Sequence, residues 1–234
     1  MARVVLVGVA HHLTQRGIDR RDVFLDEADY EIYLRMVRTS AQRYRTELLG
    51  YCLMPNHVHW IVVPLLVNSL AETFRDAHSR YSAYVNAKLS RNGHFWQNRF
   101  FSCPMDQAHL WSAMRYVERN PVRAHMVNCA SAFRWSSAAV HTGLLPRPDW
   151  LEAKPIESAF SCDEWDVLLR SETMGEAEVE LRKNTHTGRP IGSHEFVEQA
   201  EFSVGRKLAP QTGGRPPNSI AARASAGIEQ IVLF

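Results

Sequence analysis

The stretch "YCLMPNHVHWIVVP", residues 51–64, contains two apolar runs separated by "MPNH", and the rest of the chain can be arranged around it. Pro and Asn between apolar runs are turn signals, and a second proline, Pro64, ends the second run because proline cannot donate to a strand ladder. We therefore expect strands over about 47–54 and 57–64, joined by a turn. The second strand carries two histidines, His57 and His59.

The two histidines are separated by one residue, so on a strand they point to the same face. Their backbone positions are about 7 Å apart. Two imidazoles on one face can share a metal ion. A His-x-His pair in a strand is also often structural, so the pair alone leaves both interpretations open and other residues must converge on it.

Outward from this hairpin, helical and extended patterns alternate. Apolar residues at helical spacing follow Asp26 and Asp106, which are both suitable N-cap residues, and Ser69 with Glu72 matches a capping box. An α+β fold with a central antiparallel sheet and packed helices is therefore expected over residues 1–145. The expected strands cover about 3–16, 47–54, 57–64 and 94–103, and the expected helices about 26–44, 69–88 and 106–120.

Residues 146–234 have a looser pattern, which predicts a small, mostly helical C-terminal annex. "LLPRPDWLEAKP" resembles a surface linker, "CDEWDVLLRSE" a short helix, and "GRPIGSHEFVEQAEFSVGRKLAP" a turn followed by one more helix. "QTGGRPPNS" predicts a flexible tail. A DNA-binding role for the annex is a hypothesis.

Composition narrows the class of protein. The chain has 234 residues, 45% of them hydrophobic, and a net charge of +2, which fits a globular protein. Its four cysteines are scattered, so no zinc or disulfide framework is expected. "MARVVLVGVAHH" is too short an apolar run for a signal peptide or membrane span, so we expect a cytoplasmic protein without a membrane partner.

Arginine dominates the basic residues. Only 4 of the 27 basic residues are lysine, so 23 are arginine. Arginine suits forked contacts with phosphate. A GC-rich genome produces the same bias, and composition does not decide between these two explanations.

A second motif, "RYVERNPVR" at 115–123, places Tyr116 and Asn120 on one face of the third expected helix, which Pro121 should end near Asn120. The Asn120 amide oxygen could be a third ligand for a hard divalent cation beside the two imidazoles, with the Tyr116 hydroxyl one turn away. Spacing alone favours the structural interpretation, in which Tyr116 is a core or rim aromatic residue and Asn120 a C-terminal helix cap.

Four motifs in order, "HHLTQRG", "YCLMPNHVHW", "GHFWQNRF" and "RYVERNPVRAHMV", resemble the REP-associated tyrosine transposases of the HUH nuclease superfamily. The similarity spans about residues 8–140, and "GRPIGSHEFVE" resembles a C-terminal segment of that family. The resemblance implies a ferredoxin-like HUH nuclease core. It also implies His57 and His59 as metal ligands, Asn120 as the third ligand and Tyr116 as the nucleophile.

This resemblance implies a single-tyrosine, metal-dependent single-stranded DNA endonuclease and strand transferase. It would cut at hairpin-forming repeats through a covalent 5′-phosphotyrosine, with Mg²⁺ or Mn²⁺ as cofactor. A neutral ligand set leaves the cation its full charge. Expected DNA-binding residues are Arg16, Arg75, Arg80, Tyr81, Trp96, Arg99 and Arg189, although each could instead be a surface arginine or core aromatic residue.

Two other functions use the same fold. One is a domesticated regulator that binds nucleic acid without cleaving it; the other is a relaxase or replication initiator, which should carry a further metal-binding histidine and often more tyrosines. The sequence leaves both a monomer and a homodimer open.

Overall fold

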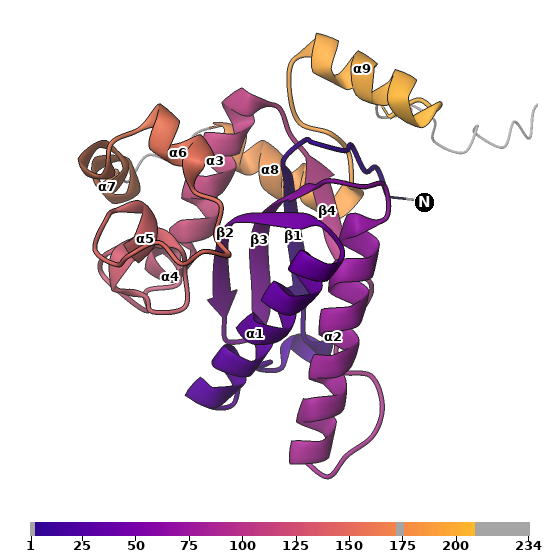
Figure 1. Cartoon of the computed structure of the whole chain (residues 1–234), viewed down its shortest axis with the longest axis vertical. Helices are drawn as coiled ribbons and strands as arrows, with labels where there is room; N and C mark the ends of the chain where they lie inside the picture. Colours follow the sequence, from indigo (N-terminus) through magenta and orange to yellow (C-terminus); the bar gives the residue numbers. More distant parts are fainter. Residues whose placement is uncertain (1–2, 172–175, 209–234) are drawn as a thin grey trace, which may run out of the picture.

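The computed structural model describes residues 3–171 and 176–208, and its centre is a four-stranded antiparallel sheet in the order β2-β3-β1-β4. The strands are β1 (His11–Arg16), β2 (Thr46–Met54), β3 (His57–Pro64) and β4 (Phe101–Pro104). The hairpin expected around "MPNH" is β2–β3, and the α+β prediction is confirmed (Figure 1).

The register of β1 against β3 decides which side chains share a face. Thr14 lies opposite His59 and Arg16 opposite His57, while His12 lies opposite Ile61. Residues directly opposite in an antiparallel pair project to the same side. The β1 face that carries His12, Thr14 and Arg16 is therefore also the face of both β3 histidines.

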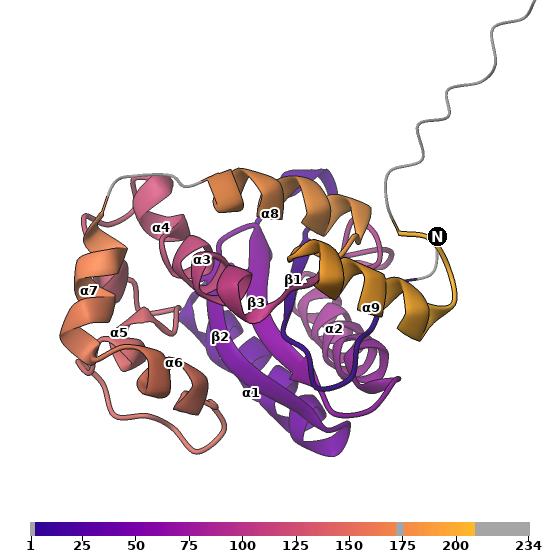
Figure 2. The same cartoon turned by 90° about the horizontal axis from the view of Figure 1, so that it is seen from above.

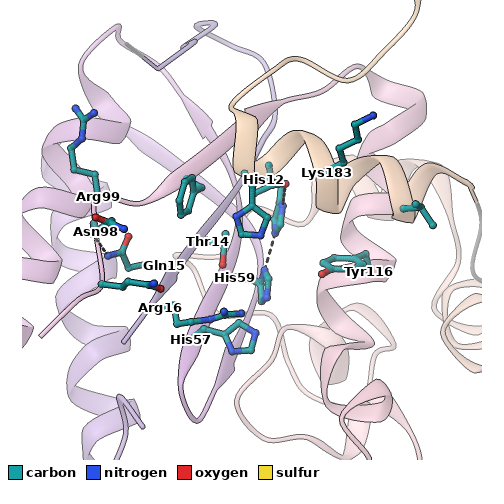
Figure 3. A pocket seen from close by; sticks show the side chains of 15 residues that line it. His12, Thr14, Gln15, Arg16, His57, His59, Asn98, Arg99, Tyr116 and Lys183 are labelled. Atoms are coloured by element: carbon teal, nitrogen blue, oxygen red, sulfur yellow. Dashed lines mark hydrogen bonds between the residues drawn. The ribbon is translucent and has the colours of Figure 1, made fainter. Parts of the chain in front are cut away.

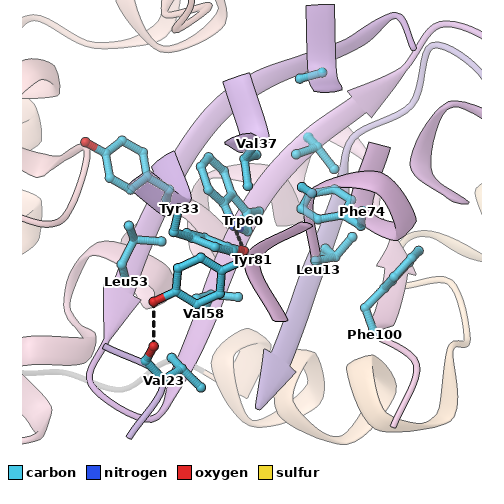
Figure 4. Packing of buried hydrophobic residues seen from close by; sticks show 14 of the residues in the cluster. Leu13, Val23, Tyr33, Val37, Leu53, Val58, Trp60, Phe74, Tyr81 and Phe100 are labelled. Carbon is cyan, nitrogen blue, oxygen red and sulfur yellow. Dashed lines mark hydrogen bonds between the residues drawn. The ribbon is translucent and has the colours of Figure 1, made fainter. Parts of the chain in front are cut away.

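The other face of the sheet is apolar and is covered by α1 (Glu27–Arg43) and α2 (Ser69–Lys88). Figures 1 and 2 show these two helices side by side on that face. Their aromatic residues pack on Leu13, Val58 and Trp60 from the sheet, as Figure 4 shows. Because β1 and β3 alternate, burial of these residues directs the histidines to the opposite face.

The histidine face is covered by α3 (Gln107–Glu118) and α8 (Glu176–Thr187) (Figure 2). Ile61 and Met114 share one hydrophobic cluster there with Trp165, Leu181 and Ile191 of the annex, so the annex and the first part of the chain bury a common core. The remaining helices are α4 (Asn120–Arg123), α5 (Ala138–His141), α6 (Lys154–Ala159), α7 (Cys162–Arg170) and α9 (His194–Val204), with two 3-10 turns, η1 (Ile18–Arg20) and η2 (Ala130–Ala132).

Helix starts were predicted well with one exception. Asp26 and Asp106 accept the backbone N–H of Asp29 and His109, as expected for N-caps. The capping box at α2 was wrong. Ser69 is already the first helical residue, and its hydroxyl accepts the backbone N–H of Leu66 instead.

Two strands are shorter than expected. The first begins at His11 because the chain turns at Gly8, with φ of 74°, and Val4 and Leu6 pack against residues of α9 and Leu208. The fourth begins only at Phe101, because Phe95 and Trp96 turn into the aromatic core. The "LLPRPDWLEAKP" linker contains the start of α6, and the expected flexible tail after residue 208 lies outside the described residues.

The helices expected in "CDEWDVLLRSE" and "HEFVEQAEFSV" are α7 and α9. Within the described part of the chain, no helix combines the length and apolar character needed to cross a bilayer.

Candidate functional site

Three imidazoles meet on the face of the sheet that α3 and α8 cover. The ring centroids of His57 and His59 are 4.8 Å apart, and the His12 ring stacks on His59 at 5.1 Å. His12 Nε2 and His59 Nδ1 are 2.9 Å apart, within hydrogen-bond distance. The two β3 histidines thus lie together as predicted, and His12 is an additional member of the group.

Tyr116 lies beside these imidazoles. Its ring centroid is 5.9 Å from both the His59 and His12 rings. Figure 3 shows its hydroxyl oxygen directed toward His57 and His59. A tyrosine from a distant part of the sequence has therefore been brought next to the histidine pair, which the predicted role as nucleophile requires.

Helix α3 is fixed in place by a buried carboxylate two residues after Tyr116. Glu118 is fully buried and accepts hydrogen bonds from the Ser137 hydroxyl (2.5 Å) and the Trp165 indole N–H (2.8 Å). His141 Nδ1 lies 2.6 Å from the same carboxylate. Hydrogen bonds of Glu118 with α5 and α7 therefore hold the C-terminal turn of α3, and with it Tyr116, against the sheet.

Asn120 lies one turn beyond Tyr116, but its amide is used within the fold. Its Nδ2 donates to the backbone carbonyls of Tyr116 (3.2 Å) and Val117 (3.1 Å). Its Oδ1 accepts from Arg123 Nη2 at 2.8 Å, and the Arg123 guanidinium also lies 4.0 Å from the centre of the Tyr116 ring. Asn120 therefore caps α3 here, and its role as a third metal ligand stays a prediction.

The hollow beside the imidazoles has a volume of about 450 Å³. Besides the three imidazoles, its basic residues are Arg16, Arg99, Lys183 and His186, and Phe101 lines it from β4. Figure 3 shows Arg99 and Lys183 at different sides of the hollow, with Tyr116 and the histidines in its wall. Among the residues that the structure describes, no acidic side chain lines this cavity, so it suits a polyanion.

The imidazoles are held in the neutral form. Burial, with smaller contributions from Arg16 and Arg123, lowers the pKa of His57 to about 4. Burial, His57 and His12 lower the pKa of His59 well below its ordinary value, and burial lowers the pKa of His12 to about 3. Neutral rings are what a metal ion requires of histidine ligands.

The donor set determines which metal would suit this site. Among residues 3–171 and 176–208, no three side chains drawn from His, Cys, Asp and Glu are arranged to hold an ion. His57 and His59 would supply two nitrogen donors, so a bound cation would need oxygen from elsewhere, as from Asn120, water or substrate phosphate. The residues are compatible with a hard divalent ion that accepts such mixed ligands.

The predicted DNA-binding residues are not all in one place. Arg16 and Arg99 line the cavity. Arg75 and Arg80 are on α2, across the sheet, where they pair with Glu72 and Asp76. Arg189 follows α8 outside the cavity lining, and its backbone carbonyl accepts from the Cys103 thiol.

Tyr81 and Trp96, which were expected to contact DNA, are packed in the aromatic core instead. Tyr81 is 0% exposed, and its hydroxyl donates to the Val23 carbonyl in the core, as Figure 4 shows. Trp96 is 9% exposed, and its indole N–H donates to the His78 carbonyl. Two further basic residues of α2 are also engaged within the fold, because His78 is buried and Lys88 pairs with Asp29.

Sequence reasoning missed the residues that α8 supplies. Val179, Lys183 and His186 recur at helical spacing and line the cavity, while Thr185 reaches the buried His12. Their helical spacing could have predicted that these residues share one face of a helix. Because that face is mostly polar, the spacing does not show which part of the protein the face lies against. Phe101 was also missed; its ring is 37% exposed and lies 5.1 Å from the His186 ring.

Comparison with known proteins shows which family the first half of the chain resembles. A family model described as "Transposase IS200 like" matches residues 6–120, which include His12, the β3 histidines, Tyr116 and Asn120. These residues, just under half of the chain, are therefore similar to the IS200-like transposases. The resemblance inferred from the four motifs is thereby confirmed.

One solved structure agrees on the fold. A REP-associated tyrosine transposase bound to a REP hairpin is similar at a TM-score of 0.54, with 18% identity over 66% of this chain and 94% of that one. A proposed transposase from Deinococcus radiodurans R1 is 19% identical over 54% of this chain and 91% of that one; its TM-score of 0.35 carries no weight. Among curated proteins no match was found.

We expect Glu118→Ala to lower the free energy of unfolding by about 3 kcal/mol, because buried donors from three residues lose their acceptor. Urea unfolding followed by circular dichroism measures this. Glu157→Ala, on the exposed side of α6, is the matched control and should change stability by no more than about 0.5 kcal/mol. Equal stabilities of the two variants would contradict the role assigned to Glu118.

Proposed function

We propose that this protein is a transposase that cuts and rejoins single-stranded DNA in the cytoplasm through a covalent bond between Tyr116 and a 5′ phosphate. The observation that carries the proposal is the position of the Tyr116 ring, 5.9 Å from the His59 ring, in the wall of a cavity whose described lining is basic and free of acidic side chains. A nucleophile, two potential metal ligands and cations that suit phosphate are thus in one place.

The proposed step exchanges one ester for another. The Tyr116 oxygen attacks phosphorus, the bond from phosphorus to the 3′ oxygen breaks, and the strand is released with a 3′ hydroxyl. The phenolic proton lost by Tyr116 balances the proton gained by that hydroxyl. Because the phosphotyrosine retains the energy of the broken phosphodiester, the reverse attack by another 3′ hydroxyl can join strands without a nucleotide cofactor.

His57 and His59, with Asn120, would hold a Mg²⁺ or Mn²⁺ ion. Such an ion would polarise the phosphate and help to orient it. Asn120 can take part only if its oxygen turns away from Arg123, or if one of its two lone pairs accepts the Arg123 hydrogen bond while the other binds the ion. Arg123, over the Tyr116 ring, keeps the ring oriented toward the imidazoles.

The cavity also supports a strand of DNA as substrate. Arg16, Arg99 and Lys183 are spread around it and could contact successive phosphates. Phe101 lines both this hollow and a neighbouring one that includes Arg3 and Gly188, so a single strand could continue from one into the other. A hairpin substrate is proposed because the similar transposase was solved with a REP hairpin.

One observation favours a second function. The Asn120 oxygen is paired with Arg123 and does not line the cavity, which is also compatible with a regulator that binds DNA and does not cut it. The two functions differ in whether any divalent ion supports cleavage.

We expect Tyr116→Phe to abolish a DNA adduct that survives detergent, because the attacking oxygen is removed, while hairpin binding changes less than about threefold. The assay incubates a labelled single-stranded hairpin with protein and Mn²⁺ and separates the products on a denaturing gel. Tyr44→Phe, at the end of α1, is the matched control and should form the adduct normally. An adduct formed by the Tyr116→Phe variant would exclude Tyr116 as nucleophile, and no adduct from the wild type would favour the regulator.

We also expect Phe101→Ala to weaken single-strand binding by about 5- to 150-fold, the range of one lost base–aromatic stack of about 1–3 kcal/mol. Fluorescence anisotropy with a labelled oligonucleotide measures it. Phe202→Ala, on α9, removes a ring that is 91% exposed and lies outside the lining of both hollows described above, so the affinity of this variant should be unchanged. Equal affinities of both variants would rule out stacking on Phe101.

A further inference from the structure

A buried chain of hydrogen bonds runs from the annex to His59. His12 Nδ1 lies 2.8 Å from the Thr185 hydroxyl oxygen, and His12 Nε2 lies 2.9 Å from His59 Nδ1. All three side chains belong to residues that are at most 5% exposed. Thr185 and His12 are 173 positions apart, and Thr185 lies outside the residues matched by the family model.

The direction of each hydrogen bond follows from one fixed donor. The Thr185 hydroxyl donates to the Leu181 carbonyl at 2.7 Å, so its oxygen can only accept from His12. His12 must then carry its proton on Nδ1. A neutral imidazole has one N–H, so His12 Nε2 is the acceptor and His59 Nδ1 is the donor.

This arrangement leaves His59 Nε2 without a proton. Both rings are neutral because they are at most 5% exposed and a buried charge without a counter-ion is costly. A second proton on either ring would add a buried positive charge close to Arg16 and Arg123. If that proton lay between the rings, two N–H groups would also face each other at 2.9 Å.

His57 reaches the same tautomer by a separate route. Its Nδ1 lies 2.6 Å from Asn56 Oδ1, and Asn56 Nδ2 donates to the Arg20 carbonyl, which fixes the amide oxygen toward His57. His57 therefore also has a free lone pair on Nε2. Two independent arrangements thus give the two imidazoles the same protonated nitrogen.

We propose that Thr185 and His12 are positioning residues that hold His59 in its Nδ1–H tautomer, so that its Nε2 lone pair is ready for a divalent cation. This positioning role rests on the proposed function in one respect only, namely that the group bound by His59 Nε2 is a divalent cation. It gives α8 of the annex a part in setting the chemistry of the site, in addition to its place in the cavity wall. Groups that orient metal-bound histidines in this way typically contribute about 10- to 100-fold to metal affinity.

The first test uses the metal-free, full-length protein labelled with ¹⁵N. Long-range ¹H–¹⁵N correlation spectra distinguish the two tautomers of each histidine. We expect His12 and His59 to be protonated on Nδ1. A His59 proton on Nε2 in the wild type would overturn the proposal, and this result requires no variant.

The second test is Thr185→Val, which keeps the shape of the side chain and removes its oxygen. His12 then loses its acceptor, and its proton should move to Nε2, which forces His59 to the Nε2–H form. We expect the spectra to show this change and Mn²⁺ affinity, measured by calorimetry, to fall about 10- to 100-fold. Thr185→Ser should restore both. Thr187→Val, on the exposed side of the same helix, is the matched control and should change neither.

The outcomes separate this proposal from the proposed function. An unchanged tautomer and Mn²⁺ affinity in Thr185→Val would overturn the positioning role even if the wild type forms the DNA adduct. Conversely, if the predicted tautomers are found but no DNA adduct forms, the positioning role is supported and the proposed endonuclease activity is excluded.

Discussion

The pairing of β1 with β3 is the constraint on which the site depends. Thr14 opposite His59 puts the β1 residue His12 and the β3 histidines on one face, while Val58 and Trp60 enter the aromatic core on the other. Because side chains alternate along a strand, a slip of one residue would bury the histidines among aromatic rings and expose Trp60. The apolar face thus enforces the register, and the register assembles the imidazoles.

The helices on the histidine face, α3 and α8, supply the other residues of the site. Glu118 ties α3 to α5 and α7, and this tie sets where Tyr116 stands relative to the sheet. Helix α8 adds Lys183 to the cavity and Thr185 to the histidine chain. The annex is therefore more than an appendage: its apolar residues share the core beneath Tyr116, and its polar residues face the proposed substrate and the buried His12.

Local patterns predicted the parts of the fold that local physics controls. The hairpin, the caps at Asp26 and Asp106 and the helix bearing Tyr116 could all be found from spacing and turn residues. The burial of Tyr81 and Trp96 could not, since an aromatic ring serves a core as well as a base. Nor could the contact of Thr185 with His12, because it joins distant segments through single polar atoms that leave no periodic pattern.

The central claim is that a DNA strand becomes attached to the Tyr116 oxygen beside the imidazoles. The most direct measurement is to trap the complex of wild-type protein and hairpin DNA, digest it with nuclease and trypsin, and locate the remaining nucleotide by tandem mass spectrometry. The account predicts a nucleotide phosphate on the peptide of residues 116–119, carried by Tyr116. A nucleotide found on any other residue would contradict it.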